Sequence, residues 1–276
     1  MNYSPIGVFD SGFGGLTVLK ELERVLPEYD FLYFGDNARA PYGNRSFAIV
    51  HSYTREAVEW FFAQGCPLII LACNTASAKA LRTIQQKDLP RLASDRRVLG
   101  VIRPVTEQIG MLSRSGHIGI LATAGTVASH SYEIEIFKSF PDAMVSQEAC
   151  PMWVPLIENN EFDTPGADYF IQRHVDRLMA VDPLIDVVVL GCTHYPLIQK
   201  RIEDYLPSGV SVVAQGEIVA DSLTHYLQRH PEIDVRCSKH GRRDFHTSES
   251  PETFDRTAAL FYGKSVNSVQ CDGGFQ

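Results

Sequence analysis

The sequence predicts an α/β protein with two similar halves, each built on a mainly parallel β-sheet. Short apolar runs alternate with longer stretches of helical periodicity, as in parallel α/β folds. Several runs are apolar almost throughout, which is typical of strands covered on both faces. A weak internal repeat is the third observation, because IGVFDSGFGG at Ile6 is similar to IGILATAGTV at Ile118. Two such halves facing each other would form a cleft, so we expect a ligand site there, at the carboxyl ends of the strands.

Apolar runs along the chain predict the strands. Each is short, and a turn or a stretch with helical periodicity follows it. In chain order the predicted strands cover residues 6–12, 30–36, 67–73, 98–102, 117–123, 143–147, 186–192 and 210–215.

The stretches between these runs predict the helices, which cover residues 16–26, 47–65, 77–86, 193–206 and 217–230. No low-complexity segment or long linker interrupts the pattern. From Ile233 onward the chain is more polar, and its composition predicts a surface extension. We assign residues 1–98 and 212–276 to a first α/β domain and residues 99–211 to a second.

Composition narrows the class of protein. Hydrophobic residues make up 45% and charged residues 21% of the 276 residues, which is ordinary for a globular protein with a sizeable core. The net charge of −8 argues against a nucleic-acid partner, which usually requires a basic face. No secretory signal opens the chain, and its apolar runs are far shorter than the ~20 residues that span a bilayer. We therefore expect a cytoplasmic protein with no membrane partner, whose cysteines stay reduced.

Two predicted strands end in a cysteine at the point where the chain turns. PLIILAC ends at Cys73 and DVVVLGC ends at Cys192, and each is followed by a threonine within two residues. A cysteine just before a helix lies near free backbone N–H groups and the positive end of the helix dipole, which favour the thiolate. The same N–H groups are a ready site for a carboxylate. Asn74, Thr75 and Thr193 add side-chain donors beside them.

A pair of thiols in one cleft suits proton transfer at carbon. With a thiolate on one face of a bound amino acid and a thiol on the other, one removes the Cα proton and the other delivers a proton to the opposite face. The product is the mirror image, and the reverse reaction swaps the two roles. The alternative is that Cys73 and Cys192 are small buried core residues, as free cysteines often are. That interpretation applies to the remaining cysteines, which lack this setting: Cys66, Cys150, Cys237 and Cys271.

Two further segments have the composition of binding loops. The glycines of DSGFGG let the backbone turn tightly and approach a ligand, with Asp10 and Ser11 at the carboxyl end of the strand. This segment is not a dinucleotide fingerprint, because Thr17 stands at the position of the last glycine. It is equally consistent with a simple strand-to-helix turn. GDNARAPYGNRS, residues 35–46, predicts either a binding loop, with backbone N–H groups at Tyr42 and Gly43, or plain surface.

His194 follows Cys192 by two residues, and its intrinsic pKa suits proton handling or orientation of a neighbour. A zinc site on these two residues would need further ligands at suitable spacing, and the sequence offers none. We therefore expect no metal. No pair of cysteines has C-x-x-C spacing, which argues against a zinc ribbon or a thioredoxin-type centre.

Seven segments in combination carry a family resemblance: IGVFDSGFGGLTVLKEL, YFGDNARAPYGNRS, LACNTASAKAL, GVIRPV, IGILATAGTVAS, VPLIEN and VVLGCTHYPLI. Over nearly its whole length the chain resembles the glutamate racemases, enzymes that supply D-glutamate for peptidoglycan without a cofactor. The resemblance implies two pseudo-symmetric α/β domains with the active site in the cleft between them. It also implies racemisation of L-glutamate to D-glutamate by two cysteines, with no cofactor, and a homodimer.

The resemblance implies roles for particular residues. In the family, the cysteine matching Cys73 takes the proton from D-glutamate, and the one matching Cys192 takes it from L-glutamate. Asp10 and His194 match residues that assist the two thiols, and Glu158 in VPLIEN matches a further assisting carboxylate. Substrate contacts are implied for Asp10, Ser11, Tyr42, Gly43, Asn74, Thr75, Thr193 and His194, with Thr123 and Thr126 lining the cleft.

Two segments depart from the commoner family pattern. Arg103 stands where many members carry Glu, and Ala214, Gln215 and Gly216 stand where many have an Asp-Ser pair. We expect both departures to affect only features outside the catalytic core, such as a dimer interface or regulation. The segment FHTSESPETFDRTAALFYG near the end also resembles the family, which implies that the polar tail is folded.

Two alternative functions stay open from sequence alone. One is an aspartate or hydantoin racemase of the same broad superfamily, because those enzymes share paired cysteines on similar folds. The other is a ligand-binding or regulatory protein that uses the cleft without chemistry. A binding protein would need neither Cys73 nor Cys192, so the presence of both favours an enzyme.

Overall fold

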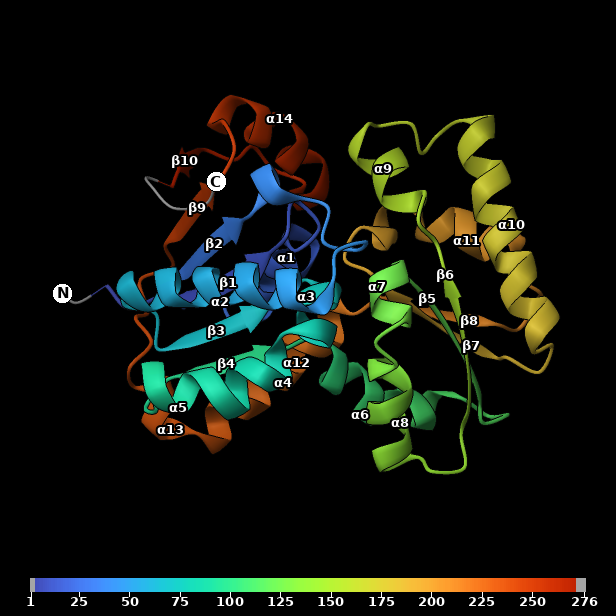
Figure 1. The fold of residues 1–276 in the computed structure, drawn as a ribbon, viewed down its shortest axis with the longest axis horizontal. Coiled ribbons are helices and arrows are strands. Elements are labelled where there is room, and N and C mark those ends of the chain that lie inside the picture. The colour runs from blue at the N-terminus through green and yellow to red at the C-terminus, as the bar shows by residue number, and fades with distance from the viewer. Residues whose placement is uncertain (1–2, 272–276) are drawn as a thin grey trace.

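The computed structural model describes residues 3–271, which form two parallel β-sheets with helices packed on their faces (Figure 1). Within that range, sheet A has the strand order β10-β9-β2-β1-β3-β4 and sheet B the order β6-β5-β7-β8. All neighbouring strands in both sheets are parallel. This arrangement confirms the predicted α/β class. Sheet A and its helices form the left half of Figure 1, and sheet B forms the right half.

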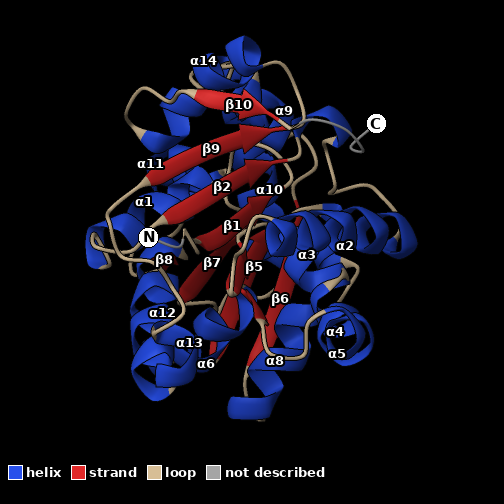
Figure 2. Ribbon diagram, turned by 90° about the vertical axis from the view of Figure 1, so that its left-hand side faces the viewer, coloured by secondary structure: helices blue, strands red, loops and turns tan. Residues whose placement is uncertain are grey.

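The strands of sheet A are β1 (Ile6–Asp10), β2 (Phe31–Gly35), β3 (Leu68–Leu71), β4 (Arg97–Gly100), β9 (Arg243–Thr247) and β10 (Ser268–Gln270). The strands of sheet B are β5 (His117–Ala122), β6 (Met144–Ala149), β7 (Val187–Gly191) and β8 (Ser211–Val213). Figure 2 shows the strands of both sheets in red, surrounded by helices.

The helices associated with the half built on sheet A are α1 (Leu16–Val25), α2 (Phe47–Ala63), α3 (Asn74–Lys79), α4 (Leu81–Thr83), α5 (Leu89–Leu92), α12 (Gly216–Arg229), α13 (Pro231–Asp234) and α14 (Pro251–Tyr262). Those of the other half are α6 (Ile102–Leu112), α7 (Ala124–Val127), α8 (Ser131–Ser139), α9 (Trp153–Glu158), α10 (Pro165–Val181) and α11 (Gln199–Tyr205). Short 3₁₀ turns are η1 (Asn37–Arg39) and η3 (Tyr195–Ile198), and η2 (Ile84–Asp88) is a π-helical turn.

Apolar side chains cover both faces of each sheet, which explains why the central strands are apolar throughout. On sheet A, alternate residues of β1 point to opposite faces: Val8 packs in a cluster with residues of α1, α12 and α14, and Phe9 in a cluster with residues of α2. On sheet B, Leu190 belongs to the cluster that includes α10, and Val189 to the cluster that includes α6 and α8. Both halves are therefore three-layered, and the first cluster is continuous between them.

The register of the strands places their carboxyl ends, where the polar residues follow, side by side. Asp10 at the end of β1 pairs with Gly35 of β2, and Phe9 pairs with Leu71 of β3. In sheet B, Ala122 of β5 pairs with Gly191 of β7. The residues directly after β3, β5 and β7 therefore leave their sheets at the edges where the carboxyl ends of parallel strands gather.

Several predicted elements differ from the observed ones. The expected helix over 77–86 begins earlier, at Asn74, and breaks into α3, α4 and the π-helical η2. The expected helix over 193–206 opens as a 3₁₀ turn with Pro196 in its first turn, and becomes α-helical only at Gln199. The sequence pattern also missed α6, α8, α9 and α10.

The prediction of a surface extension after Ile233 is wrong. β9 lies inside sheet A, between β2 and β10, and α14 buries Phe254 and Ala258 against that half of the protein. The run RDFHT of β9 has only Phe245 and Thr247 buried, so its period-2 signal is mostly polar and short. The folded tail that the resemblance implied is confirmed for residues up to 271.

Sheet A thus takes strands from both ends of the chain, and sheet B takes the central ones. The division into domains at residues 98/99 and 211/212 stays a prediction. No helix within residues 3–271 is both long enough and apolar enough to cross a membrane.

Candidate active site

Cys73 follows β3 and caps the N-terminus of α3. Its Sγ accepts a hydrogen bond from the backbone N–H of Ala76 at 3.4 Å and lies 3.4 Å from Ser11 Oγ. The side chain is buried, and burial, reinforced by the nearby charge of Asp10, raises the pKa of the thiol to about 12. The N–H of Ala76 at the N-terminus of α3 favours the thiolate, as expected, but desolvation outweighs this effect and the net shift of the pKa is upward. In this setting Cys73 is a protonated thiol.

Cys192 follows β7, and its sulfur contacts a histidine rather than the N-terminus of a regular helix. Its Sγ lies 3.8 Å from His194 Nδ1, and His194 Nε2 lies 2.8 Å from Glu158 Oε1. Burial disfavours the charged imidazole, but hydrogen bonds with Cys192 and Glu158 outweigh burial and raise the pKa of His194 to about 10. At neutral pH the ring is therefore an imidazolium that can donate hydrogen bonds to both neighbours. The edge of Phe261 meets the same ring, with centroids 5.0 Å apart.

Asp10 connects the two halves of the protein. Its Oδ1 accepts the N–H of Gly12 at 2.9 Å, and its Oδ2 accepts the hydroxyl of Thr193 at 3.4 Å. Burial raises the pKa of the carboxyl, and the positive charge of His194 opposes that rise. Asp10 therefore lies between the Cys73 side and the Cys192 side and interacts electrostatically with both.

The glycine-rich turn after β1 allows this close approach. A Cβ on Gly14 would lie 2.2 Å from Thr193 Oγ1 and 2.4 Å from His194 Nδ1, far inside van der Waals contact. Thr17 further donates from its hydroxyl to the Thr193 carbonyl at 3.0 Å. DSGFGG is therefore more than a turn, because it packs directly against the segment that carries Cys192.

Threonine hydroxyls from both halves meet beside Cys73. Thr75 Oγ1 lies 3.0 Å from Thr123 Oγ1 and 3.4 Å from Thr126 Oγ1, and the last two are 3.1 Å apart. Thr75 belongs to α3, whereas Thr126 belongs to α7 and Thr123 caps the N-terminus of α7. Such a group of adjustable hydroxyls can donate to an anionic ligand.

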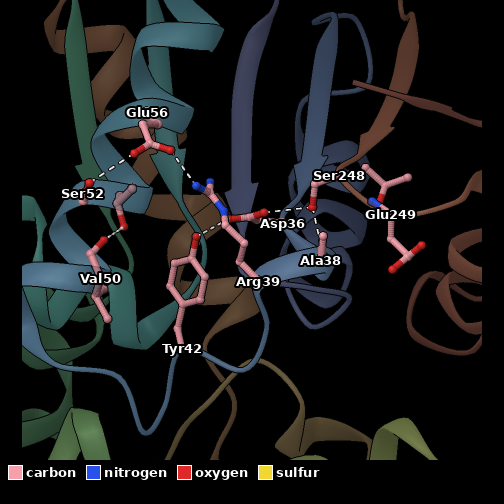
Figure 3. Close-up of polar contacts among 11 residues, drawn as sticks. Asp36, Ala38, Arg39, Tyr42, Val50, Ser52, Glu56, Ser248 and Glu249 are labelled. Atoms are coloured by element: carbon pink, nitrogen blue, oxygen red, sulfur yellow. Dashed lines mark hydrogen bonds and ion pairs between the residues drawn. The ribbon is translucent and has the colours of Figure 1, made fainter. Parts of the chain in front are cut away.

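The loop over residues 35–46 is held by a buried charge network (Figure 3). Asp36 accepts hydrogen bonds from Arg39 Nε at 2.8 Å and from the Tyr42 hydroxyl, and Arg39 Nη1 also bonds Glu56 on α2 at 2.5 Å. Because its hydroxyl is engaged with Asp36, Tyr42 can serve a ligand only through its backbone. The neighbouring Gly43 accepts the N–H of Gly125 at 2.7 Å, so the loop reaches across to α7.

Asn74 is bonded to two residues that sequence reasoning missed. Its carboxamide exchanges hydrogen bonds with Gln215, and Tyr132 donates to Asn74 Oδ1 at 2.8 Å. The expectation that the 214–216 departure affects only features outside the catalytic core is therefore wrong for Gln215. Nothing in the sequence pattern marked Tyr132, whereas the departure itself was a usable signal for Gln215. Arg103, the other departure, forms an exposed ion pair with Glu107.

The sequence-predicted residues thus converge, and most are almost fully buried. Exposed fractions are 5% for Cys73, 6% for Cys192, 1% for Asp10 and 4% for His194. A ligand reaches these groups only if the side chains covering them move. Cys66, Cys150 and Cys237 are buried, as expected for cysteines that only pack in the core. Cys150 directly follows β6, however, so the expectation that it lacks a strand-end setting is wrong.

Comparison with known proteins agrees with this geometry. Residues 6–223 match the family described as Asp/Glu/Hydantoin racemase. A glutamate racemase of Ruegeria pomeroyi is 39% identical over 271 residues, which cover 95% of this chain and 97% of that protein.

Solved structures of high similarity carry the same name. A glutamate racemase isoform of Bacillus anthracis has a TM-score of 0.89 at 32% identity, covering 99% of this chain and 98% of that one. A glutamate racemase of Francisella tularensis, solved in complex with D-glutamate, has a TM-score of 0.87 at 28% identity, covering 100% and 99%. Since the family match spans most of the chain and these relatives align over nearly its full length, the chain belongs to the Asp/Glu/hydantoin racemase family, among the glutamate racemases.

Proposed function

We propose that this protein interconverts L- and D-glutamate without a cofactor, with Cys73 and Cys192 as the two acid/base groups. The observation that carries the proposal is the pair of buried thiols from two sheets, each with its own polar partners. Their electrostatic environments differ: Cys73 is held as a neutral thiol, and Cys192 lies against an imidazolium. Racemisation needs one proton acceptor and one proton donor at the start of each turnover, and this asymmetry supplies both.

In the direction from L-glutamate, the thiolate of Cys192 takes the Cα proton. The imidazolium of His194 stabilises the negative sulfur beforehand, and Glu158 holds the ring in place through Nε2. Cys73 then delivers its proton to the opposite face of the carbanion, which gives D-glutamate. The C–H bond broken on one face is replaced by a C–H bond on the other, and the two cysteines have exchanged their protonation states.

Proton transfer by positioned side chains explains only part of the required acceleration. General acid–base catalysis usually contributes ~10²- to 10⁴-fold, and the Cα proton of an amino acid is very weakly acidic. The remainder is assigned to fixed donors around the developing carbanion in a dry site. Thr75 and Thr193 are buried hydroxyl donors suited to that task.

We assign substrate contacts to the residues that converge on the two thiols: Asp10, Ser11, Tyr42, Gly43, Asn74, Thr75, Thr193 and His194. For Tyr42 and Gly43 the contact is through the backbone. Supply of D-glutamate for peptidoglycan in the cytoplasm, a homodimeric state, and the division into domains 1–98 with 212–276 and 99–211 complete the proposal.

The direct test is circular dichroism of purified protein with L-glutamate, D-glutamate or L-aspartate and no added cofactor. The proposal predicts loss of optical activity from both glutamate enantiomers and little from aspartate. Cys73→Ser and Cys192→Ser are the matched variants, and each should lose most of the activity. Near-normal racemisation by both variants refutes the two-thiol mechanism, whereas preference for aspartate refutes only the substrate.

A further inference from the structure

Three polar side chains form a closed, buried triangle beside Cys73. Asn74 Nδ2 donates to Gln215 Oε1 at 2.7 Å, and Gln215 Nε2 donates back to Asn74 Oδ1 at 3.0 Å. The Tyr132 hydroxyl donates to Asn74 Oδ1 at 2.8 Å and is itself bonded by Gln215 Nε2. All three side chains are nearly inaccessible to water, with Asn74 exposed by 3%, Tyr132 by 0% and Gln215 by 4%.

The triangle joins the two halves of the protein. Asn74 directly follows Cys73 and begins α3, on the side of sheet A. Tyr132 lies on α8, on the side of sheet B. It is close to Cys192, because a negative charge on this sulfur adds to the effect of burial in raising the pKa of the tyrosine. Gln215 lies where the chain returns from β8 of sheet B to α12, which packs on α1. One side chain on this return segment therefore contacts both halves.

The hydrogen-bond pattern fixes the orientation of Asn74. The two carboxamides pair in a reciprocal ring, and the tyrosine hydroxyl adds a second donor to Asn74 Oδ1. Both lone-pair directions of that oxygen are then occupied, so the remaining capacity of the carboxamide is one Nδ2 hydrogen. A buried amide that loses such partners keeps its full desolvation cost, which holds the ring together.

We propose that Gln215 and Tyr132 are positioning residues for racemisation. Through Asn74 they hold Cys73 at a fixed position relative to the half that carries Cys192. This inference rests on the proposed function and adds two residues that act through Asn74.

The test is a double-mutant cycle on kcat and KM for L-glutamate, with Gln215→Ala, Asn74→Ala and the double variant. A misplacement of about 1 Å in a catalytic geometry costs up to ~100-fold. We therefore expect Gln215→Ala to lower kcat by about 10- to 100-fold, with KM changed less than about threefold. If Gln215 acts through Asn74, the same change in the Asn74→Ala background costs less than about twofold. Gln228→Ala, at an exposed position on the helix α12 that follows Gln215, is the matched control and should match the wild type.

Tyr132→Phe gives an independent arm should Gln215→Ala fail to fold. It removes one donor and keeps the carboxamide ring, so its loss in kcat should be smaller, about 3- to 10-fold, and should also vanish when Asn74 is alanine. Losses that add in full across the cycle overturn the inference, as does a lower melting temperature with unchanged kcat and KM. A wild-type protein that does not racemise glutamate refutes the proposed function instead, and this inference with it.

Discussion

The pairing of His194 with Glu158 makes a quantitative prediction for Glu158→Gln. In the native protein, Glu158 Oε1 lies 2.8 Å from His194 Nε2, and the histidine pKa is raised from its usual 6.5 to about 10. Glutamine keeps the size of the side chain and an acceptor oxygen but removes the negative charge. The imidazolium then loses the negative charge that lies beside its Nε2.

The size of the effect follows from the raised pKa. At ~1.36 kcal/mol per unit, the rise to about 10 corresponds to about 5 kcal/mol in favour of the charged ring. A hydrogen bond to a charged group contributes ~1.5–3 kcal/mol of such a total, or about one to two pKa units. We therefore expect the pKa of His194 to fall to roughly 8–9 in the variant.

The assay is the pH dependence of kcat/KM for racemisation, followed by circular dichroism from pH 7 to 10.5. Because a neutral imidazole does not stabilise the Cys192 thiolate, the alkaline limb should lie near pH 10 in the wild type and move down by one to two units in Glu158→Gln. At pH 9.5 the variant should be about tenfold slower than the wild type. The two enantiomers have equal free energy in water, so kcat/KM must fall equally for both.

The matched control is Glu161→Gln, which makes the same change of charge at an exposed position three residues along the chain. Its pH profile should overlay that of the wild type. An alkaline limb that stays in place in Glu158→Gln, with any loss of activity independent of pH, would refute the assignment of His194 as the charged partner of Cys192.

Three further predictions concern packing, burial and pH. Gly14→Ala places a Cβ 2.4 Å from His194 Nδ1, so the unfolding free energy should drop by ~1–3 kcal/mol and kcat should fall with it; an unchanged kcat contradicts the close packing. Arg39→Leu leaves the buried Asp36 carboxylate without its cation and should lower the urea-unfolding free energy by ~3–5 kcal/mol; a loss below 1 kcal/mol contradicts a buried ion pair. Folding raises the pKa of His194 to about 10 and that of the Cys73 thiol to about 12, so the stability that each group contributes is complete below its unfolded pKa and is lost as the pH rises towards its folded pKa. The free energy of unfolding in urea should therefore fall from pH 7 to pH 10, and a rise over this range contradicts the shifts.

Much of the site follows from the order of residue types along the chain. Cys73 and Cys192 stand out because each ends an apolar strand, and parallel strands bring their carboxyl ends to one edge of a sheet. Asp10 stands out for the same reason at the end of β1. Local pattern therefore predicted these three positions at the sheet edges, but it missed Cys150, which follows the incompletely buried strand β6.

The remaining features depend on contacts distant in sequence. Gln215 reaches Asn74 across 141 residues, and no local pattern records that distance. The raised pKa of Cys73 depends on burial and on the charge of Asp10, which outweigh the helix N-terminus that the sequence showed. β9 was missed because it is short and mostly polar, and its place inside sheet A depends on pairing with β2 from the other end of the chain.

The most direct test of the account follows deuterium during racemisation of L-glutamate in heavy water, without a cofactor, with the two enantiomers separated at early times. With two thiols on opposite faces, D-glutamate should carry deuterium at Cα from the first turnover, while the remaining L-glutamate stays largely protiated. Equal deuterium in both enantiomers from the start would mean that one base serves both faces. Such a result would contradict the division of roles between Cys73 and Cys192.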